Sequence, residues 1–373
     1  MKSFTTALSV LLLLSVISTE NIYSQAQLYD TGTMQMRVDT YGAMRFWTIE
    51  GTDTVQHLNR VNVLVAGNTD QVLDYYNDID VEVPTTLETN PQLSDYEISG
   101  TYNNAYSGLP PNVLVEQHVY GWQSGKYALI KMIVTNNESE ALPTIVGLDV
   151  VQYVDFTWEN DNVFWDAANE MLVQFESHYV GIKYLSEPVT SAQVLVWYDG
   201  YSSDDPTTYA FLTEGTFDTD TLVTDPDGSV SFLGSDVQTL QPQESRTLYL
   251  AVALGANESE MHDNMQLAMQ KYNGIVSVES DYNNIPANFV LDQNYPNPFN
   301  PGTKISWQSP VDGYQKLIVY DVIGNEVATL INEYRSAGNY DILFDASHLS
   351  SGIYFYELVV DKFSSVKKMI LLR

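Results

Sequence analysis

The sequence contains no cysteine among its 373 residues. This absence excludes disulfide bonds, thiolate catalysis and cysteine-ligated zinc sites in one step. The stability of such a protein outside the cell has to come from packing or from bound ions.

Basic residues are scarce as well. The chain has 16 Lys and Arg against 48 Asp and Glu, and its formal net charge is −32. Residues 27–279 hold 37 of the acidic residues and only 8 of the basic ones. Such a negative field repels phosphate backbones and anionic membranes, which argues against nucleic-acid binding. It also attracts divalent cations, but a solvated acidic surface explains the charge more simply than a dedicated cation store.

Long apolar runs are limited to residues 7–17, which is too short to span a bilayer. Lys2 precedes this run, and Ser24 and Ala26 place small residues at the −3 and −1 positions of a cleavage site. We therefore expect residues 1–26 to be a secretory signal peptide and the mature chain to have no transmembrane segment.

Several chemical signatures are missing. No Gly-x-Ser-x-Gly elbow, phosphate-binding glycine loop or alternation of strands and helices occurs. The histidines are His57, His118, His178, His262 and His348. None of them forms a His-x-His or His-x-x-x-His pair, so a zinc site would have to be assembled from distant segments.

Short segments of alternating apolar and polar residues are plentiful. Strands are predicted at residues 34–39, 43–49, 61–67, 113–120, 127–136, 144–154, 171–175, 180–185, 193–198 and 247–253. Residues 74–112 are rich in turn-forming residues, and we expect long loops there. This spacing predicts an all-β fold in which residues 27–275 form a large, acidic antiparallel β-sandwich, the passenger.

One helix is predicted at the end of the passenger. Asn257-Glu258-Ser259-Glu260 is typical of a capping box, and the methionines that follow lie on one face at helical spacing. Gly274 stands where a C-terminal capping glycine belongs. We interpret the methionine stripe as core and residues 276–288 as a linker.

Acidic and aromatic residues crowd residues 155–166. Aromatic platforms hold sugar rings, and paired carboxylates can divide the acid and base roles of glycoside chemistry. A histidine on a strand could act as the general base of such a site. The sugar-binding candidates are therefore Asp155, Trp158, Glu159, Asp161, Trp165 and His118. A loop with structural aromatics and a hydrogen-bonded strand histidine is the alternative.

A second acidic run provides oxygen ligands for calcium. Its candidates are Asp218, Asp220, Asp225 and Asp227. The run is not an EF-hand, because no glutamate closes it, and Asp-Pro-Asp-Gly is also an ordinary turn sequence. Calcium is the one cofactor that the sequence indicates, with a plain hairpin turn as the alternative.

The C-terminal module, residues 289–373, has a nearly balanced charge. It opens with Tyr295-Pro296-Asn297-Pro298-Phe299-Asn300-Pro301, in which the prolines force an extended backbone and the two aromatics can pin it to a sheet. Strands are predicted at residues 303–308, 315–320, 326–330, 340–344, 353–360 and 364–372. This pattern predicts an immunoglobulin-like β-sandwich.

The module resembles the type A C-terminal sorting domain of the type IX (Por) secretion system. The resemblance rests on the segments 291–301, 319–327, 349–356 and 366–373. The residues that carry it are Tyr295, Pro296, Asn297, Pro298, Phe299, Asn300, Pro301, Gly324, Gly352, Lys367 and Lys368. The passenger resembles an uncharacterised β-sandwich region of secreted proteins with this module, on the segments 136–149, 248–255 and 264–273.

The sorting-domain resemblance implies a route. The chain would cross the inner membrane, fold in the periplasm and cross the outer membrane, with the type IX machinery and its sorting protease as partners. The passenger would then be released or attached to a surface glycolipid. The expected location is outside the cell or on its outer surface.

Two classes remain open for the passenger. We expect a non-catalytic binding or structural β-sandwich that recognises a glycan, an ion or a surface partner. The alternative is a carbohydrate-active enzyme, namely a hydrolase, a lyase or a mutarotase-like protein. The two differ in whether His118 and the carboxylates of residues 155–166 share one cleft.

Overall fold

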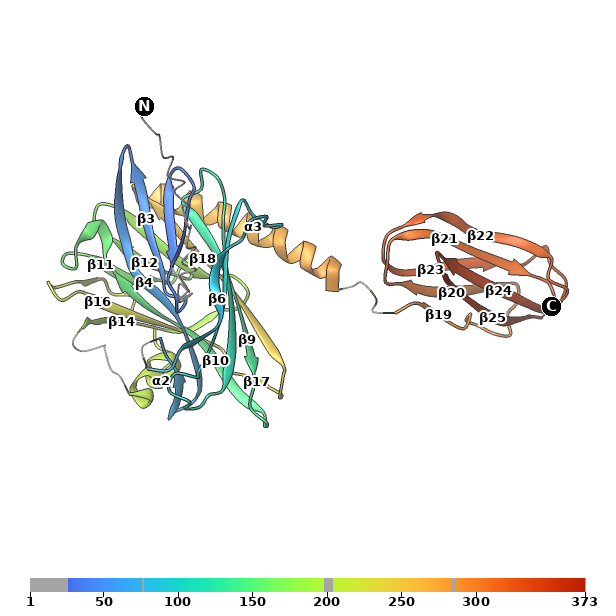
Figure 1. Cartoon of the computed structure of the whole chain (residues 1–373), viewed down its shortest axis with the longest axis horizontal. Coiled ribbons are helices and arrows are strands. Elements are labelled where there is room, and N and C mark those ends of the chain that lie inside the picture. The colour runs from blue at the N-terminus through green and yellow to red at the C-terminus, as the bar shows by residue number, and fades with distance from the viewer. Residues whose placement is uncertain (1–25, 76, 198–203, 284–285, 287, 373) are drawn as a thin grey trace, which may run out of the picture. The chain divides into compact units, whose positions relative to one another are not determined.

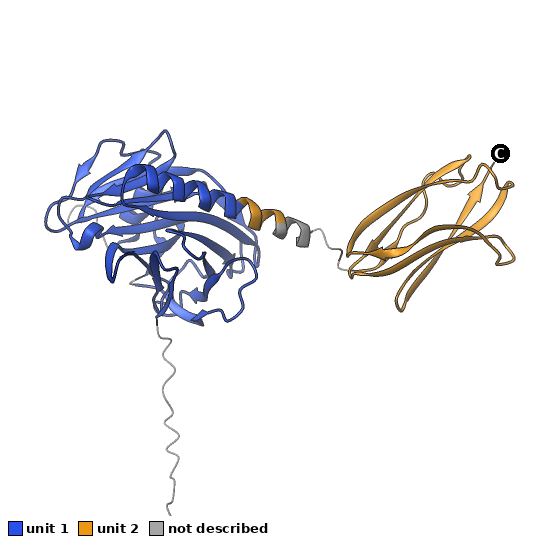
Figure 2. Ribbon diagram, turned by 90° about the horizontal axis from the view of Figure 1, so that it is seen from above, with its two compact units in different colours: residues 1–272 blue, residues 273–373 orange. Residues whose placement is uncertain are grey.

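A computed structural model of the chain describes residues 26–75, 77–197, 204–283, 286 and 288–372. The predicted signal peptide lies outside these described residues, apart from Ala26. Within the described part of the chain, no helix is long and apolar enough to cross a membrane. The chain divides into two compact units, residues 1–272 and 273–373 (Figure 2).

The predicted all-β class is confirmed, because antiparallel sheets dominate both units (Figure 1). The first sheet of the larger unit has the strand order β1-β2-β3-β4-β10-β16-β14, and β5 and β17 pair with β4 and β10. Its strands are β1 (Gln27–Asp30), β2 (Met34–Val38), β3 (Met44–Glu50), β4 (Asp53–Asn68), β5 (Gln71–Leu73), β10 (Leu142–Gln152), β14 (Val189–Val196), β16 (Ser229–Ser235) and β17 (Gln238–Leu240).

The second sheet of this unit has the order β15-β11-β12-β13-β18-β9-β8-β7-β6. Its strands are β6 (Asp80–Leu87), β7 (Tyr96–Asn103), β8 (Val113–Gly121), β9 (Tyr127–Asn136), β11 (Asn162–Asp166), β12 (Met171–Phe175), β13 (Tyr179–Tyr184), β15 (Leu222–Val223) and β18 (Ser245–Gly255). The prediction of long loops over residues 74–112 was wrong, because β6 and β7 lie there. β6 is an edge strand, and an edge strand can accommodate Pro84.

The main core lies between the two sheets. Met34, Met36 and Val38 of β2 are buried at every second position, as expected for one inward face. β4 and β10 are instead buried along most of their length, because a second apolar cluster covers their other face. Strands covered on both faces lose the alternating pattern.

Helix α2 (Asp205–Thr213) contacts β5, β14 and β16 on that outer side, and the sequence did not predict it. Asp204 caps it by accepting a 2.9 Å hydrogen bond from the N–H of Thr207. The helix lies very close to β16, since a Cβ atom at Gly234 would come within 2.0 Å of the Leu212 carbonyl oxygen. The glycine therefore makes room for the helix.

Helix α3 (Glu258–Asn283) has the predicted capping box. Asn257 Oδ1 accepts a 3.0 Å hydrogen bond from the N–H of Glu260, whose carboxylate accepts one of 2.8 Å from Ala256. Met261 and Met265 are buried, in agreement with a core role for the stripe. The helix does not end at Gly274 but continues to Asn283, so the predicted linker begins inside it.

The smaller unit is a sandwich of two antiparallel sheets around its own core. One sheet has the order β19-β20-β23 and the other β22-β21-β24-β25. The strands are β19 (Val290–Leu291), β20 (Gly302–Ser309), β21 (Gly313–Tyr320), β22 (Glu326–Arg335), β23 (Gly338–Asp345), β24 (Gly352–Val360) and β25 (Phe363–Leu371).

Candidate functional site

Two histidines and an aspartate from distant segments meet in the larger unit. His57 lies on β4, Asp155 lies in the short 3₁₀ turn η1 (Val154–Phe156) after β10, and His178 lies in the turn between β12 and β13. One ligand-type atom from each residue lies within 4.8 Å of the others. The two sheets and the η1 turn therefore bring together a donor set that no local spacing contains.

The imidazoles direct their Nδ1 atoms at one carboxylate oxygen. Nδ1 of His178 hydrogen-bonds Oδ1 of Asp155, and Nδ1 of His57 lies 3.8 Å from the same oxygen. The other oxygen of Asp155 accepts hydrogen bonds from the backbone N–H groups of Ser177 and His178, at 2.8 and 3.1 Å, and from the Ser177 hydroxyl at 2.6 Å. Oδ1 is therefore the oxygen that faces both rings.

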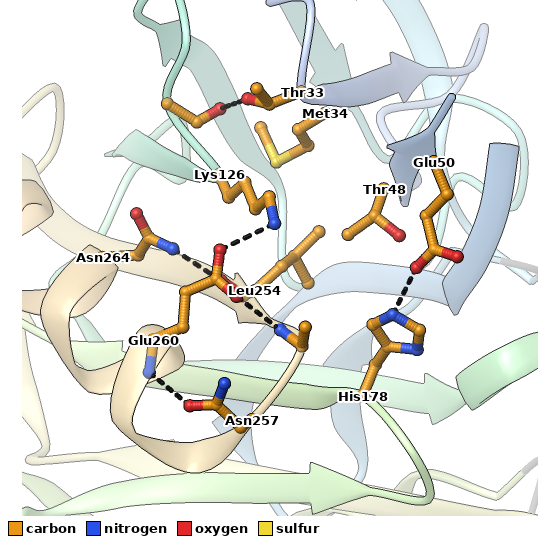
Figure 3. Close-up of polar contacts among 12 residues, drawn as sticks. Thr33, Met34, Thr48, Glu50, Lys126, His178, Leu254, Asn257, Glu260 and Asn264 are labelled. Carbon is orange, nitrogen blue, oxygen red and sulfur yellow. Dashed lines mark hydrogen bonds and ion pairs between the residues drawn. The ribbon is translucent and has the colours of Figure 1, made fainter. Parts of the chain in front are cut away.

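The Nε2 atoms of both rings have partners of their own. Nε2 of His57 is 2.7 Å from the buried Thr48 hydroxyl, and Nε2 of His178 is 2.5 Å from Oε1 of Glu50. Figure 3 shows the dashed contact from His178 to Glu50 on β3. These partners fix the orientation of each ring.

His57 is fully buried, and its Nδ1 has no hydrogen-bond partner. Burial lowers the pKa of His57 to about 3, with a further contribution from the neighbouring His178. Lys126 adds to this lowering, and its Nζ is held 2.7 Å from Glu260 (Figure 3). The imidazole of His57 is therefore neutral and keeps a nitrogen unused.

A separate hollow of about 260 Å³ is lined by Trp158, Trp197, Pro226 and Asp227. The turn of residues 225–228 forms one wall, and its Gly228 carbonyl accepts a 3.0 Å hydrogen bond from the N–H of Trp197. The hollow thus combines two indoles with an exposed carboxylate.

A third feature is a hollow of about 320 Å³ lined by Tyr41, Tyr75, Ile79 and Tyr106. The Tyr106 side chain is 73% exposed, and the Tyr75 hydroxyl is 2.6 Å from Asp39. The sequence predicted neither the hollow lined by tyrosines nor the histidine cluster.

In the smaller unit, the proline-rich segment is fastened to both sheets. Tyr295 exchanges 2.9 Å backbone hydrogen bonds with Lys304 of β20. The N–H of Phe299 donates to Ile370 and its carbonyl accepts from Leu372, both at 2.9 Å, and its ring is buried in the core. Asn297 Oδ1 accepts a 2.9 Å hydrogen bond from the N–H of Ile370.

Residues 293–372 match the family model described as a secretion system C-terminal sorting domain. The chain carries a type IX C-terminal sorting domain. The sorting domain directs export to the cell surface or beyond it and makes the type IX machinery a partner of this chain. The family model does not cover the passenger, so it assigns no function to that part of the chain.

No curated protein matches the chain. Among solved structures, the chain is similar to a bacterial glucoamylase complexed with acarbose, at 10% identity and a TM-score of 0.47, over 71% of this chain and 36% of that one. It is also similar to a polysaccharide lyase, at 8% identity and a TM-score of 0.35, over 91% of this chain and 46% of that one. The chain thus covers less than half of each of these two structures.

A protein from Synechocystis sp. PCC 6803 is 10% identical, with a TM-score of 0.38, over 62% of this chain and 96% of that one. Because all three TM-scores are below 0.5, these similarities do not indicate an activity for this chain.

The predicted sorting-signal residues lie in three places. Tyr295 to Pro301 form the fastened segment, and Gly324 has a φ of 87° in the turn before β22, where a glycine is favoured. Gly352, Lys367 and Lys368 lie on the paired strands β24 and β25. Their role in sorting stays a prediction.

The predicted sugar-binding residues do not gather at one place. Trp158 lines the indole hollow, whereas Trp165 is buried in the core against Phe217. Asp155 belongs to the histidine cluster, and Glu159 is exposed. His118 on β8 lies between Glu97 and Glu116, at 2.8 and 2.7 Å.

Asp161 is fully buried. One of its oxygens accepts a 3.2 Å hydrogen bond from the N–H of Val154, and the other has no partner. Burial, with a smaller contribution from the nearby Glu176 and Asp155, raises its pKa to about 7.

The calcium candidates have local roles. Asp218 accepts a 2.7 Å hydrogen bond from the N–H of Val194, and Asp225 accepts one of 3.0 Å from the N–H of Asp227 within the turn. Asp220 is exposed. Calcium binding by Asp218, Asp220, Asp225 and Asp227 stays a prediction.

Proposed function

We propose that the passenger is a non-catalytic carbohydrate-binding β-sandwich that the sorting domain delivers to the cell exterior. The observation that carries this proposal is the hollow formed by Trp158, Trp197, Pro226 and Asp227. Indole faces stack on the C–H faces of sugar rings, and a carboxylate at the rim accepts hydrogen bonds from sugar hydroxyls. At about 260 Å³, the hollow suits one sugar ring rather than a long buried chain.

The surroundings hold both indoles in place. The ring of Tyr153 lies 4.4 Å from that of Trp158, and a Cβ atom at Gly228 would lie 3.1 Å from the Trp158 ring. The guanidinium of Arg60 lies 5.7 Å from the Trp197 ring and is bound to Asp149 at 2.7 Å. Pre-oriented rings lose little conformational entropy when a ligand binds, which supports a binding role.

The charge of the chain narrows the class of glycan. The net charge of −32 disfavours sulfated and uronic-acid polymers, because they would bring further negative charge to an acidic surface. Neutral glycans with exposed hexose units are the class that we propose.

The positions of the acidic groups support binding rather than catalysis. His118 is engaged by Glu97 and Glu116, whereas Asp155 is engaged by His178. These residues therefore do not supply a paired acid and base beside the indole hollow.

The test is a glycan array followed by calorimetric titration of the best neutral ligand with the full chain. Trp158→Ala and Trp197→Ala should each weaken binding about thirtyfold, because a buried aromatic contact contributes about 2 kcal/mol. Tyr106→Ala is the matched control, since it removes an exposed ring from the other hollow. Binding lost in Tyr106→Ala but kept in Trp158→Ala would contradict the proposal, and release of sugar over time would favour the enzyme alternative.

We propose that the remaining steps follow the route implied by the sorting domain. Removal of residues 286–373 should leave a folded passenger in the periplasm, as measured by cell fractionation. Attachment to a surface glycolipid would appear as a large, heterogeneous mass increase on the cell-bound passenger, whereas a released passenger would have a single mass. Export of the truncated chain at the normal level would contradict the delivery step.

A further inference from the structure

We infer that His57, Asp155 and His178 form a binding site for one divalent transition-metal ion, with zinc as the best fit. The first argument is convergence. Donor atoms from a strand, a 3₁₀ turn and a hairpin turn lie within 4.8 Å of one another. Ligands of a tetrahedral zinc ion lie about 3.4 Å apart, which follows from metal–ligand bonds of about 2.1 Å.

The second argument is the unused nitrogen of His57. Its Nδ1 is buried, has no hydrogen-bond partner and lies 3.8 Å from Oδ1 of Asp155. A buried polar atom without a partner is costly in a folded protein. In the tautomer that carries its proton on Nε2 and donates it to Thr48, Nδ1 presents its lone pair to the space that it shares with Asp155 and His178.

The third argument is the outer set of partners. Metal-binding histidines usually donate their second N–H to a carboxylate or another oxygen, which fixes the ring and raises its basicity. Here Glu50 holds Nε2 of His178 at 2.5 Å, and Thr48 holds Nε2 of His57 at 2.7 Å. In contrast, His118 has two carboxylate partners but no second histidine beside it.

Charge and ligand type select the metal. Asp155 and Glu50 supply two carboxylates to balance a double positive charge, and the Lys126 ammonium is held by Glu260. Two imidazole nitrogens favour zinc and related ions over calcium or magnesium, which prefer oxygen alone. Binding of the ion would release to solvent the proton of the hydrogen bond between His178 Nδ1 and Asp155 Oδ1, and both atoms would become ligands.

The residues around the site differ in exposure. Thr48 and His57 are fully buried, whereas the Glu50 side chain is 49% exposed and marks the entrance. A water molecule can complete the coordination there. This site is distinct from the aspartate run at residues 218–227 and from the indole hollow.

The test uses the full chain after dialysis against a chelator. Zinc chloride is titrated by calorimetry, bound metal is measured by elemental mass spectrometry, and cobalt(II) is used as a spectroscopic probe. We expect one equivalent of zinc, a rise of the thermal unfolding midpoint, and cobalt absorption typical of nitrogen and oxygen ligands in a tetrahedral site.

Asp155→Asn and His178→Asn are the informative variants, because asparagine tolerates the left-handed backbone of Asp155 (φ 54°) and His178 is part-exposed. Each should weaken zinc binding about 100-fold or more. His118→Asn is the matched control and should bind zinc like the wild type. Absence of zinc binding, or unchanged binding in both Asp155→Asn and His178→Asn, would overturn the inference.

Discussion

The hydroxyl of Tyr356 donates a 2.6 Å hydrogen bond to the backbone carbonyl of Asp292. The hydroxyl oxygen of Tyr356 in turn accepts a 2.8 Å hydrogen bond from the N–H of Asn294. One buried phenol on β24 therefore fixes the backbone immediately before the Tyr-Pro-Asn-Pro segment of the sorting domain. The start of this segment depends on a residue more than 60 positions later in the chain.

Tyr356→Phe should lower the free energy of unfolding of the sorting domain by about 1 to 3 kcal/mol, because it leaves two backbone groups without partners. Limited proteolysis of the full chain in urea would measure this loss. Tyr354→Phe is the control, since that hydroxyl bonds only the Ser350 carbonyl and its loss should cost about 1 kcal/mol. Equal stability of the two variants would show that the Tyr356 contacts contribute little.

The buried ion pair of the passenger gives a second prediction. Arg60 and Asp149 are both buried and lie 2.7 Å apart. Arg60→Met should destabilise the passenger by about 3 to 5 kcal/mol, because it leaves a buried carboxylate unpaired. The double variant Arg60→Met/Asp149→Leu should recover most of that loss in urea unfolding.

The more exposed pair of Lys126 and Glu260 provides the comparison for this prediction. Its side chains are 23% and 35% exposed, so Lys126→Met should cost about 1 kcal/mol or less. A loss as large as that of Arg60→Met would contradict the assignment of the effect to burial.

Asp161 gives a prediction about pH. Its pKa in the folded chain is raised to about 7, from an ordinary value of 3.8, mainly because it is buried. Between these values the folded chain keeps a proton that the unfolded chain has lost, so the free energy of unfolding falls as the pH rises from about 4 to about 7. Asp161→Asn resembles the protonated acid and should remove this fall.

Urea unfolding between pH 4 and pH 8 would measure the difference. The Asp161→Asn variant should match the wild type near pH 4 and exceed it by about 1 to 3 kcal/mol at pH 8. Asp166→Asn is the control, because that carboxylate only accepts hydrogen bonds from its own turn. A parallel pH dependence of wild type and Asp161→Asn would contradict the prediction.

Gly255, the last residue of β18, and Gly274, inside α3, should respond in opposite directions to alanine. A Cβ atom at Gly274 would meet nothing within 4 Å, and Gly274→Ala should stabilise the helix by about 0.5 to 1 kcal/mol. A Cβ atom at Gly255 would lie 2.3 Å from the backbone nitrogen of Met261, so Gly255→Ala should destabilise by about 1 to 3 kcal/mol. Thermal unfolding of both variants checks the signs.

Features with local causes were predictable from the sequence. The capping box at Asn257 and Glu260, the buried stripe of Met261 and Met265, and the alternation along β2 and β8 all follow from neighbouring residues. The end of α3 was not predictable in this way, because Gly274 adopts a helical conformation inside the helix. A capping glycine and a tolerated helical glycine look the same in sequence.

The histidine cluster could not be predicted, because His57 lies about 100 positions before Asp155 and His178 along the chain. His57 looks like any polar residue in an alternating strand, and His178 like any turn residue. The pairing of β10 with β4 carries Asp155, which follows β10, to His57, and the hairpin of β12 and β13 presents His178 to the same carboxylate. The absence of cysteine was the useful signal, since it limits any transition-metal site to histidine and carboxylate ligands.

The two 2.9 Å backbone hydrogen bonds between Phe299 and the segment from Ile370 to Leu372 join the first part of the sorting domain to its last. The proline-rich segment is thus held by residues about 70 positions later in the chain, which are synthesised after it. A polypeptide that stops before residue 370 lacks both bonds and cannot close this part of the fold. The sorting domain can therefore finish folding only after synthesis has passed residue 372.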